Sequence, residues 1–368
     1  MFCLQERLDA LSKMLNKNQL DSILVMSPAN IFYLSGYYTE PHERVIAAYI
    51  NPKHDPLLIV PAMEEADAKN AGWRYDIIGY HDHEDPWDLF FDYLKKQETF
   101  PQTMGLEYDH TTLTQFKHIE RMLPHTKTID AQRLLADLRV IKNEHEHALL
   151  KQAAELADYG IETGMKAIRE GINELELIAI IEYELKKQGV RDMSFSTMVL
   201  TGEKTASPHG TPGTRQMKKG DLVLFDLGVV YKGYCSDITR TAAFQSISDE
   251  QENIYKTVLT AGEKAIAACQ TGIPLGEIDK TARTHIDEAG YGDYFTHRIG
   301  HGLGIETHEY PSLNSGNTLP LASGMSFTIE PGIYVPNTGG VRIEDMIFMT
   351  KKGPDVLTKY PKDLQIID

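Results

Sequence analysis

The strongest constraint on the fold of this chain comes from two aspartates that stand inside strand-like apolar segments. Asp226 interrupts the run Leu-Val-Leu-Phe-Asp-Leu, and Asp237 lies within the next strand-like segment, eleven residues later. If the segments form a hairpin with residues 231–232 as its loop, Asp226 lies directly opposite Asp237, with Cβ atoms roughly 4.5–5.5 Å apart. Like charges repel at that distance, so the fold requires a shared proton, a cation or a basic partner, for which Arg240 is a candidate.

A second acidic pair lies near the end of the chain. Strand alternation in 326–330 places Glu330 on the same face as two hydroxyl side chains, and in 341–345 it places Arg342 and Glu344 on one face. Turn residues between these segments predict a hairpin that brings Glu330 near Glu344. Arg342 is then a basic neighbour that partly neutralises the pair.

Histidines are concentrated in a glycine-rich loop between the two pairs, and one more precedes them: His297, His301 and His308, and His209. Glycines on both sides of His301 permit close backbone approach. A single loop histidine is more often a surface residue than a ligand. Two aspartates, two glutamates and one imidazole together, however, are a ligand set for two divalent ions such as Mn²⁺, Co²⁺, Fe²⁺ or Zn²⁺.

Composition excludes several classes of function. The chain has 368 residues with 37 basic and 53 acidic side chains, a net charge of −16, which disfavours non-specific nucleic-acid binding. No apolar run approaches the ~20 residues of a membrane span. The three cysteines have unrelated spacings, and the first residues lack a basic and apolar leader, so we expect a cytoplasmic protein.

The length predicts two domains. We expect an α/β domain over 1–130, where short apolar strands alternate with helices, and an α+β domain over 131–368. The helices that periodicity predicts are 4–18, 62–71, 86–96, 111–122, 134–169, 174–187, 248–271 and 275–289. The predicted strands are 22–26, 44–50, 56–61, 197–200, 222–228, 234–244, 325–330 and 341–350. Ser246 with Asp249 is a candidate cap for the helix at 248.

The motifs resemble the pita-bread metallopeptidases, in the branch of Xaa-Pro dipeptidases (prolidases) and Xaa-Pro aminopeptidases. The resemblance is carried by the two aspartates eleven apart, by His-Arg-Ile-Gly-His-Gly-Leu-Gly from 297, by Glu-Pro-Gly-Ile-Tyr from 330 and by Gly-Val-Arg-Ile-Glu-Asp from 340. It extends over the whole chain and is strongest for short bacterial dipeptidases. It implies a creatinase/prolidase-type N-terminal domain before a pita-bread catalytic domain.

The resemblance also implies residue roles. Asp226, Asp237, His301, Glu330 and Glu344 would hold two divalent ions, most simply Mn²⁺, with Asp237 and Glu344 bridging. A hydroxide between the ions would attack the peptide carbonyl of an Xaa-Pro dipeptide. The further implied residues are catalytic Glu330, His308 and His209, substrate-binding His297, Arg298, His42 and Arg44, and Arg342 behind the ligands. A homodimer is implied as well, while the composition predicts no nucleic-acid or membrane partner.

Alternative functions stay open at this point. An Xaa-Pro aminopeptidase acting on longer peptides has the same ligands, and Ser312 stands where some prolidases have an arginine for the dipeptide carboxylate. A methionine aminopeptidase would normally lack the first domain, and a creatinase-type hydrolase would not need the complete ligand set. A non-catalytic pita-bread protein that binds peptides usually lacks ligands, and none of the five is missing here.

Overall fold

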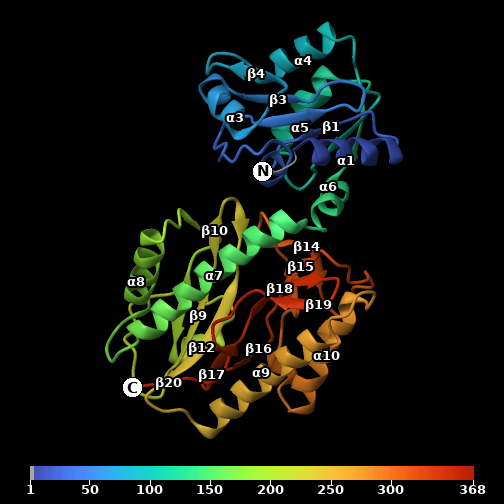
Figure 1. Cartoon of the computed structure of the whole chain (residues 1–368). Helices are drawn as coiled ribbons and strands as arrows, with labels where there is room; N and C mark the ends of the chain where they lie inside the picture. Colours follow the sequence, from blue (N-terminus) through green and yellow to red (C-terminus); the bar gives the residue numbers. More distant parts are fainter. Residues whose placement is uncertain (1–3) are drawn as a thin grey trace. The chain divides into compact units, whose positions relative to one another are not determined.

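A computed structural model describes residues 4–368, and the chain forms two compact units, Met1–Arg139 and Val140–Asp368 in the sequence, of which Figure 1 shows the elements. The sequence had placed the boundary after residue 130. The difference arises from helix α6 (Gln132–Arg139), which buries Leu134 and Leu135 and contacts helix α1 (Leu4–Lys17) of the first unit. The first cysteine, Cys3, lies outside the described residues, while Cys235 and Cys269 are buried free thiols.

The first unit is an α/β layer structure around one six-stranded sheet of order β4-β3-β2-β1-β5-β6. Strands β1, β5 and β6 are parallel, as are β3 and β4, whereas β2 pairs antiparallel with both β1 and β3. Its strands are β1 (Ser22–Val25), β2 (Ala47–Ile50), β3 (Leu57–Pro61), β4 (Asp76–Tyr80), β5 (Thr103–Leu106) and β6 (Lys127–Asp130). Its other helices are α1 (Leu4–Lys17), α2 (Pro28–Ser35), α3 (Glu65–Ala71), α4 (Pro86–Lys96) and α5 (Leu113–Met122).

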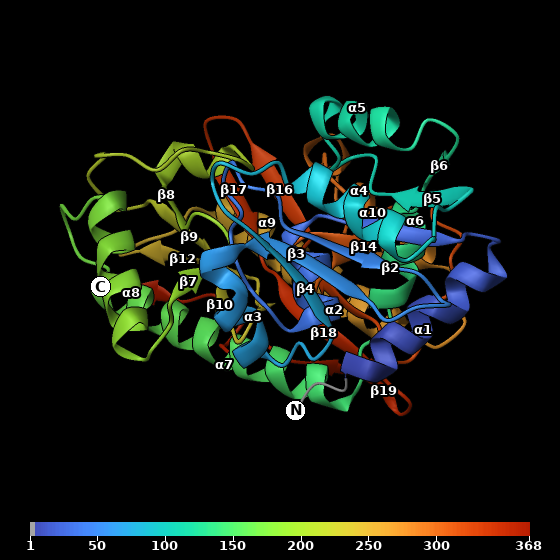
Figure 2. The same cartoon turned by 90° about the horizontal axis from the view of Figure 1, so that it is seen from above.

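The second unit has helices on both sides of its strands. In Figures 1 and 2 the strands lie between the pair α7 (Glu144–Ala167) and α8 (Glu174–Lys187) and the pair α9 (Asp249–Ala268) and α10 (Leu275–Glu288). One sheet has the order β20-β12-β9-β8, and another has the order β14-β13-β15-β18-β19. The strands of this unit are β7 (Asp192–Met193), β8 (Met198–Thr201), β9 (Leu222–Leu227), β10 (Val229–Tyr231), β11 (Tyr234–Cys235), β12 (Ile238–Phe244), β13 (Gly300–Gly302), β14 (Glu309–Leu313), β15 (Ser326–Ile329), β16 (Gly332–Val335), β17 (Gly339–Arg342), β18 (Asp345–Thr350), β19 (Gly353–Val356) and β20 (Ile366–Ile367).

The helix predicted over 134–169 is wrong as one element. It divides into α6 and α7, because Asn143 begins a new helix and forms a capping box with Glu146. The expected cap at Ser246 is also wrong: Ser248 caps α9 and forms its capping box with Gln251. The described part of the chain contains no helix with the length and apolar character needed to cross a lipid bilayer.

The hairpin that carries the two aspartates differs in register from the prediction. Val230 pairs with Cys235, and in the longer pairing of β9 with β12 the partner of Asp226 is Thr239 rather than Asp237. The loop is Lys232-Gly233, whose φ angles are 48° and 84°. A two-residue hairpin loop favours positive φ at both positions. Glycine adopts positive φ without strain, and the observed register places Gly233 at the second position, where the predicted register would have placed Lys232. The shift is two residues, so both aspartates stay on one face.

The second acidic pair lies at the ends of two paired strands. In the β15–β18 ladder Ile329 pairs with Asp345, so the next position outward places Glu330 opposite Glu344. The segment between them is more than a turn, because β16 and β17 form their own hairpin with Tyr334 opposite Gly340. The predicted proximity of Glu330 and Glu344 is therefore reached through two nested hairpins rather than one.

Candidate metal centre

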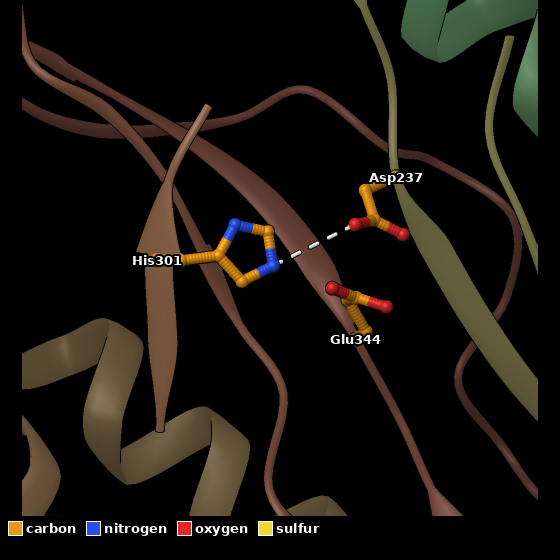
Figure 3. Close-up of side chains that lie close together, drawn as sticks. All are labelled: Asp237, His301 and Glu344. Atoms are coloured by element: carbon orange, nitrogen blue, oxygen red, sulfur yellow. Dashed lines mark ion pairs between the residues drawn. The ribbon is translucent and has the colours of Figure 1, made fainter. Parts of the chain in front are cut away.

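Five segments of the second unit bring the predicted ligands to one cavity of about 880 Å³. Asp226 comes from β9, Asp237 immediately precedes β12 and His301 lies on β13. Glu330 immediately follows β15, and Glu344 immediately precedes β18. All five line the cavity. Figure 3 shows Asp237, His301 and Glu344 pointing towards one another from three segments.

The distances within this cluster suit a shared cation. Ligand atoms of Asp237, His301 and Glu344 all lie within 4.8 Å of one another. The Nε2 atom of His301 is 3.7 Å from Oδ2 of Asp237 and 3.4 Å from Oε1 of Glu330. Asp237, His301 and Glu344 are nearly inaccessible to solvent, so water does not screen their charges.

Arg342 is the basic side chain that contacts the cluster, and it contacts Asp226 first. Its Nη2 donates to Oδ2 of Asp226, and its Nε donates to the Thr239 hydroxyl at 3.0 Å. That hydroxyl in turn donates to Oε2 of Glu344 at 2.7 Å. The other carboxylate oxygen of Asp226, Oδ1, is buried without a hydrogen-bond partner, which a buried carboxylate oxygen rarely is.

Burial and mutual repulsion raise the pKa of three acids in the cluster. Burial is the largest cause for Asp237 and for Glu344, followed by their neighbouring carboxylates, and both pKa values lie well above the ordinary range. Burial raises the pKa of Glu330 to about 7, against the opposing effects of Arg342 and Arg298. The neighbouring basic groups thus do not fully offset the cost of ionising these acids, and a further positive charge is needed for all of them to be ionised together.

The hydrogen bonding of His301 indicates which positive charge would offset the ionised acids. Its Nδ1 lies 3.1 Å from the carbonyl oxygen of Gly302, which assigns the proton to Nδ1 and leaves a lone pair on Nε2, facing two carboxylates. Burial lowers the pKa of His301 to about 3, so protonation does not relieve the repulsion. A lone pair directed at anions, together with the unpartnered Oδ1 of Asp226, fits a divalent cation ligated by these residues.

Arg240 does not neutralise the aspartate pair. Its guanidinium is fully buried and pairs with Asp345 at 2.8 Å, while Lys362 binds the other oxygen of Asp345 at 2.7 Å. Arg240 also donates to the main-chain carbonyl of Glu344 at 2.5 Å. This cation therefore supports the backbone behind the cluster, and the basic-partner alternative for Asp226 is met by Arg342 instead.

The other predicted residues of the second unit surround the cluster. The rings of His301 and His308 are edge to face with centroids 4.2 Å apart, and His297 Nε2 lies 2.9 Å from the hydroxyl of Tyr334. His209 and Arg298 also line the cavity, and Arg298 donates to the Ser312 hydroxyl at 3.2 Å. Burial lowers the pKa of His297 to about 4 and lowers that of His308.

Two predicted substrate residues belong to the first unit, which we describe by itself. His42 has a positive φ of 51° in the segment between α2 and β2. Arg44 pairs with Asp82 at 3.2 Å and with Glu43 at 3.1 Å on the surface. Their role at a substrate stays a prediction.

Tyr334 is a cavity residue to which the sequence assigned no role. Its hydroxyl accepts from Nη1 of Arg342 at 2.9 Å and lies against His297. Because His297 Nδ1 faces the carbonyl of its neighbour Arg298 at 2.8 Å, Nε2 accepts the Tyr334 proton. Tyr334 is the last residue of the Glu-Pro-Gly-Ile-Tyr motif, and its closeness in sequence to the ligand Glu330 could have indicated that it belongs to the site.

Gly300 provides a direct test of how β13 positions His301. A Cβ atom on Gly300 would lie 1.9 Å from the main-chain oxygen of Thr328, so Gly300→Ala must push β13 away from β15. We expect a loss of metal affinity of tenfold or more together with a lower melting temperature, measured by metal titration and thermal unfolding. Gly272→Ala, in a loop with open space around the Cβ but a φ of 93°, is the control: reduced stability with unchanged metal affinity. Equal metal affinity in both variants would contradict this account of β13.

Comparison with known proteins supplies the family of both parts of the chain. Residues 148–351 match metallopeptidase family M24, and residues 7–141 match the creatinase/prolidase N-terminal domain. A Bacillus subtilis (strain 168) protein named "Putative dipeptidase YkvY" is 51% identical over 98% of this chain and 99% of its own length.

Solved structures resemble the chain over its whole length. An Xaa-Pro dipeptidase from Bacillus anthracis has a TM-score of 0.92 and 34% identity, covering 99% of this chain and 100% of that one. A prolidase from Pyrococcus horikoshii OT3 has a TM-score of 0.90 and 34% identity, covering 98% and 99%. An X-Pro aminopeptidase from Thermotoga maritima MSB8 has a TM-score of 0.87 and 29% identity, covering 96% and 100%.

Proposed function

Because the chain belongs to metallopeptidase family M24, we propose that it is an Xaa-Pro dipeptidase that works with two divalent metal ions. The observation that carries the proposal is the cavity lined by four carboxyl groups and one imidazole, in which the nearby basic side chains do not offset the cost of ionising the acids. Structures named Xaa-Pro dipeptidase and prolidase, similar over nearly the full chain, support the substrate class.

In this proposal the ligand roles follow the chemistry of each side chain. Asp226 would hold one ion, His301 and Glu330 would complete one site, and Asp237 and Glu344 would be shared between the two ions. Oxygen ligands with one imidazole suit Mn²⁺. When bound, two such ions polarise a peptide carbonyl and lower the pKa of a water between them towards neutrality.

The protein's own groups then handle protons and orientation. His308, neutral at pH 7 because burial lowers its pKa, donates to the carbonyl oxygen as that oxygen gains charge. Glu330 takes a proton from the attacking water and passes it to the leaving proline nitrogen, which has no N–H of its own in the peptide. His209 and His297 contact the substrate from the cavity wall, and Arg342 keeps Asp226 in place.

Arg298 favours a dipeptide over a longer peptide. Its guanidinium lines the cavity and is oriented by the Ser312 hydroxyl. A dipeptide ends in a free carboxylate at proline, and a guanidinium binds a carboxylate with strong charge-assisted hydrogen bonds. A tripeptide offers an amide at the same place. In this proposal Arg298 binds the dipeptide carboxylate, a role that Ser312 cannot fill. The proposal also includes a homodimer, in which His42 and Arg44 help to exclude longer peptides.

The proposal is tested by comparing Leu-Pro, Leu-Pro-Gly and Leu-Gly as substrates of the Mn²⁺-loaded protein. We expect kcat/KM for Leu-Pro to exceed that for Leu-Pro-Gly by roughly 100-fold or more, because only the dipeptide offers a free carboxylate at proline to pair with Arg298. Leu-Gly has the carboxylate but lacks the proline ring that the cavity wall contacts, so we expect its kcat/KM to be lower than that of Leu-Pro as well. A chelator should abolish turnover and Mn²⁺ restore it. Efficient cleavage of Leu-Pro-Gly would instead identify an aminopeptidase, and metal binding without any cleavage would identify a peptide-binding protein.

A further inference from the structure

Outside the metal centre, the carboxylate of Glu174 is fully buried at the first turn of α8 and collects four hydrogen bonds. The main-chain N–H and the hydroxyl of Thr201 donate to Oε1 at 2.9 and 3.0 Å. The main-chain N–H of Gly213 donates to Oε2 at 2.7 Å, and Lys204 pairs with the same oxygen. A buried carboxylate is retained only when it is satisfied in this way.

The donors bracket one segment of the chain, residues 202–213, which we call the strap. Thr201 immediately precedes the strap, Lys204 lies in its first turn, and Gly213 ends it. The strap begins with a short 3₁₀ helix (Gly202–Ala206) and then has no regular structure. Consecutive residues of its second half line the same cavity as the metal cluster: Pro208, His209, Gly210, Thr211 and Pro212.

The two halves of the strap are held differently. The first half packs on β17, where the N–H of Gly340 donates to the Thr205 hydroxyl at 2.8 Å. Within the second half, Gly210 N–H donates to the carbonyl of Ser207 at 3.0 Å, a bond internal to the strap. Attachment of that half to α8 comes at Gly213, whose N–H binds Glu174 and whose carbonyl accepts from Leu175 N–H at 3.4 Å.

We propose that Glu174 is a positioning residue for the dipeptidase reaction: by tying both ends of the strap to α8, it sets where His209 meets the substrate. The inference rests on the proposed function for its kinetic consequence but not for its structural one. Glu174 touches neither substrate nor ligands, so it acts through the strap. The cavity wall that it holds is built from loop residues, which need such an anchor to stay in place.

Glu174→Gln tests this anchor, because one amide group cannot accept hydrogen bonds from both ends of the strap. An amide turned to keep its oxygen towards Thr201 presents its NH₂ to the N–H of Gly213 and to the ammonium of Lys204, and donors then face donors. The reverse orientation opposes the NH₂ to the N–H of Thr201. Either way one end of the strap loses its acceptor, while the ligands of the metal cluster are unchanged. Glu184→Gln, on the same helix and paired at the surface with Lys187, is the matched control.

Hydrogen exchange of the Mn²⁺-loaded protein measures the structural part. We expect faster exchange across peptides covering 202–213 in Glu174→Gln, with no change in peptides covering β13 and β15 and no change anywhere in Glu184→Gln. Bound Mn²⁺ should stay at the wild-type level. Lys204→Met, which removes only the cation, should give a smaller change of the same kind, and it supplies the measurement if Glu174→Gln does not fold.

Kinetics on Leu-Pro measure the functional part. We expect Glu174→Gln to raise KM at least fivefold with kcat within twofold of wild type, because the strap contacts substrate but not the ligands. In a His209→Ala background the same change should raise KM less than twofold, since residues that act through one another are not additive. Full additivity with His209→Ala, an effect confined to kcat, or unchanged exchange in the strap would each overturn the inference. Failure of the wild type to cleave Leu-Pro would refute the proposed function and leave the exchange result to decide the anchoring by itself.

Discussion

An Asp237→Asn protein should lose roughly 10³-fold or more in kcat/KM on Leu-Pro and, in the absence of metal, should be more stable than the wild type. The activity falls because a neutral amide cannot bridge two cations as a carboxylate does. The metal-free stability rises because burial and three neighbouring carboxylates disfavour the charged form of Asp237 in the folded protein. Asparagine has nearly the same shape and removes that charge.

Two measurements check the two halves of this prediction: steady-state kinetics with measured metal content, and urea unfolding with and without chelator. Asp21→Asn is the contrasting control, because Asp21 accepts hydrogen bonds from the N–H groups of Gln102 and Thr103, and its pKa is lowered. That variant should lose stability with and without metal and keep its metal affinity. Wild-type turnover in Asp237→Asn would remove the basis of the catalytic assignment.

Asp237 is needed for activity but lowers the stability of the metal-free protein, and this conflict explains why the candidate ligands could be identified from the sequence. A carboxylate that costs stability in the apo fold, such as Asp237, stands out among the apolar residues of a strand. The predicted register was wrong by two residues, yet Asp226 and Asp237 stayed on one face, because side chains alternate with a period of two. Prediction of the face therefore needed less accuracy than prediction of the pairing partner.

Features that depend on loop paths could not be predicted in the same way. The segment between Glu330 and Glu344 contains turn residues that concealed the β16–β17 hairpin. The sequence linked Arg342 to Glu344 because they share a strand face, whereas the guanidinium contacts Asp226 and reaches Glu344 through Thr239. Long side chains choose partners from every element around them, and a pattern along one strand does not contain that information.

Some local signals were available in the sequence but were assigned to the wrong residue or element. The long helix predicted from 134 is interrupted at Asn143, and its capping box with Glu146 is a recognisable helix start. Ser248 and Gln251 form the same signal three residues apart, and Ser248 lies two positions after Ser246, the predicted cap. The short strands β4, β5 and β6 were not predicted, because the parallel pairing of β4 with β3, of β5 with β1 and of β6 with β5, rather than a clear sequence pattern, defines them.

The metal-free wild type should lose stability as pH rises from about 5 to 8, whereas the Mn²⁺-loaded protein should not. An acid with a raised folded-state pKa binds more protons in the folded than in the unfolded chain, so its contribution to stability falls as pH rises through that interval. For Glu330 the interval runs from 4.5 to about 7, which corresponds to roughly 3 kcal/mol at 1.36 kcal/mol per pKa unit. Asp237 and Glu344 are shifted in the same direction.

Bound metal reverses the sign of this pH dependence of stability. Metal binding displaces the protons from the acids, so the affinity of the protein for metal rises with pH. Urea unfolding at pH 5.5 and pH 8, with chelator or with Mn²⁺, measures both slopes, and proton release on adding Mn²⁺ to weakly buffered protein measures the exchange directly. Glu330→Gln is the control, since it removes one of the three acids and should flatten the metal-free slope. If metal-free wild type and Glu330→Gln showed the same pH dependence, Glu330 would not be held in the fold at a raised pKa, and the charge imbalance inferred for the cluster would be wrong.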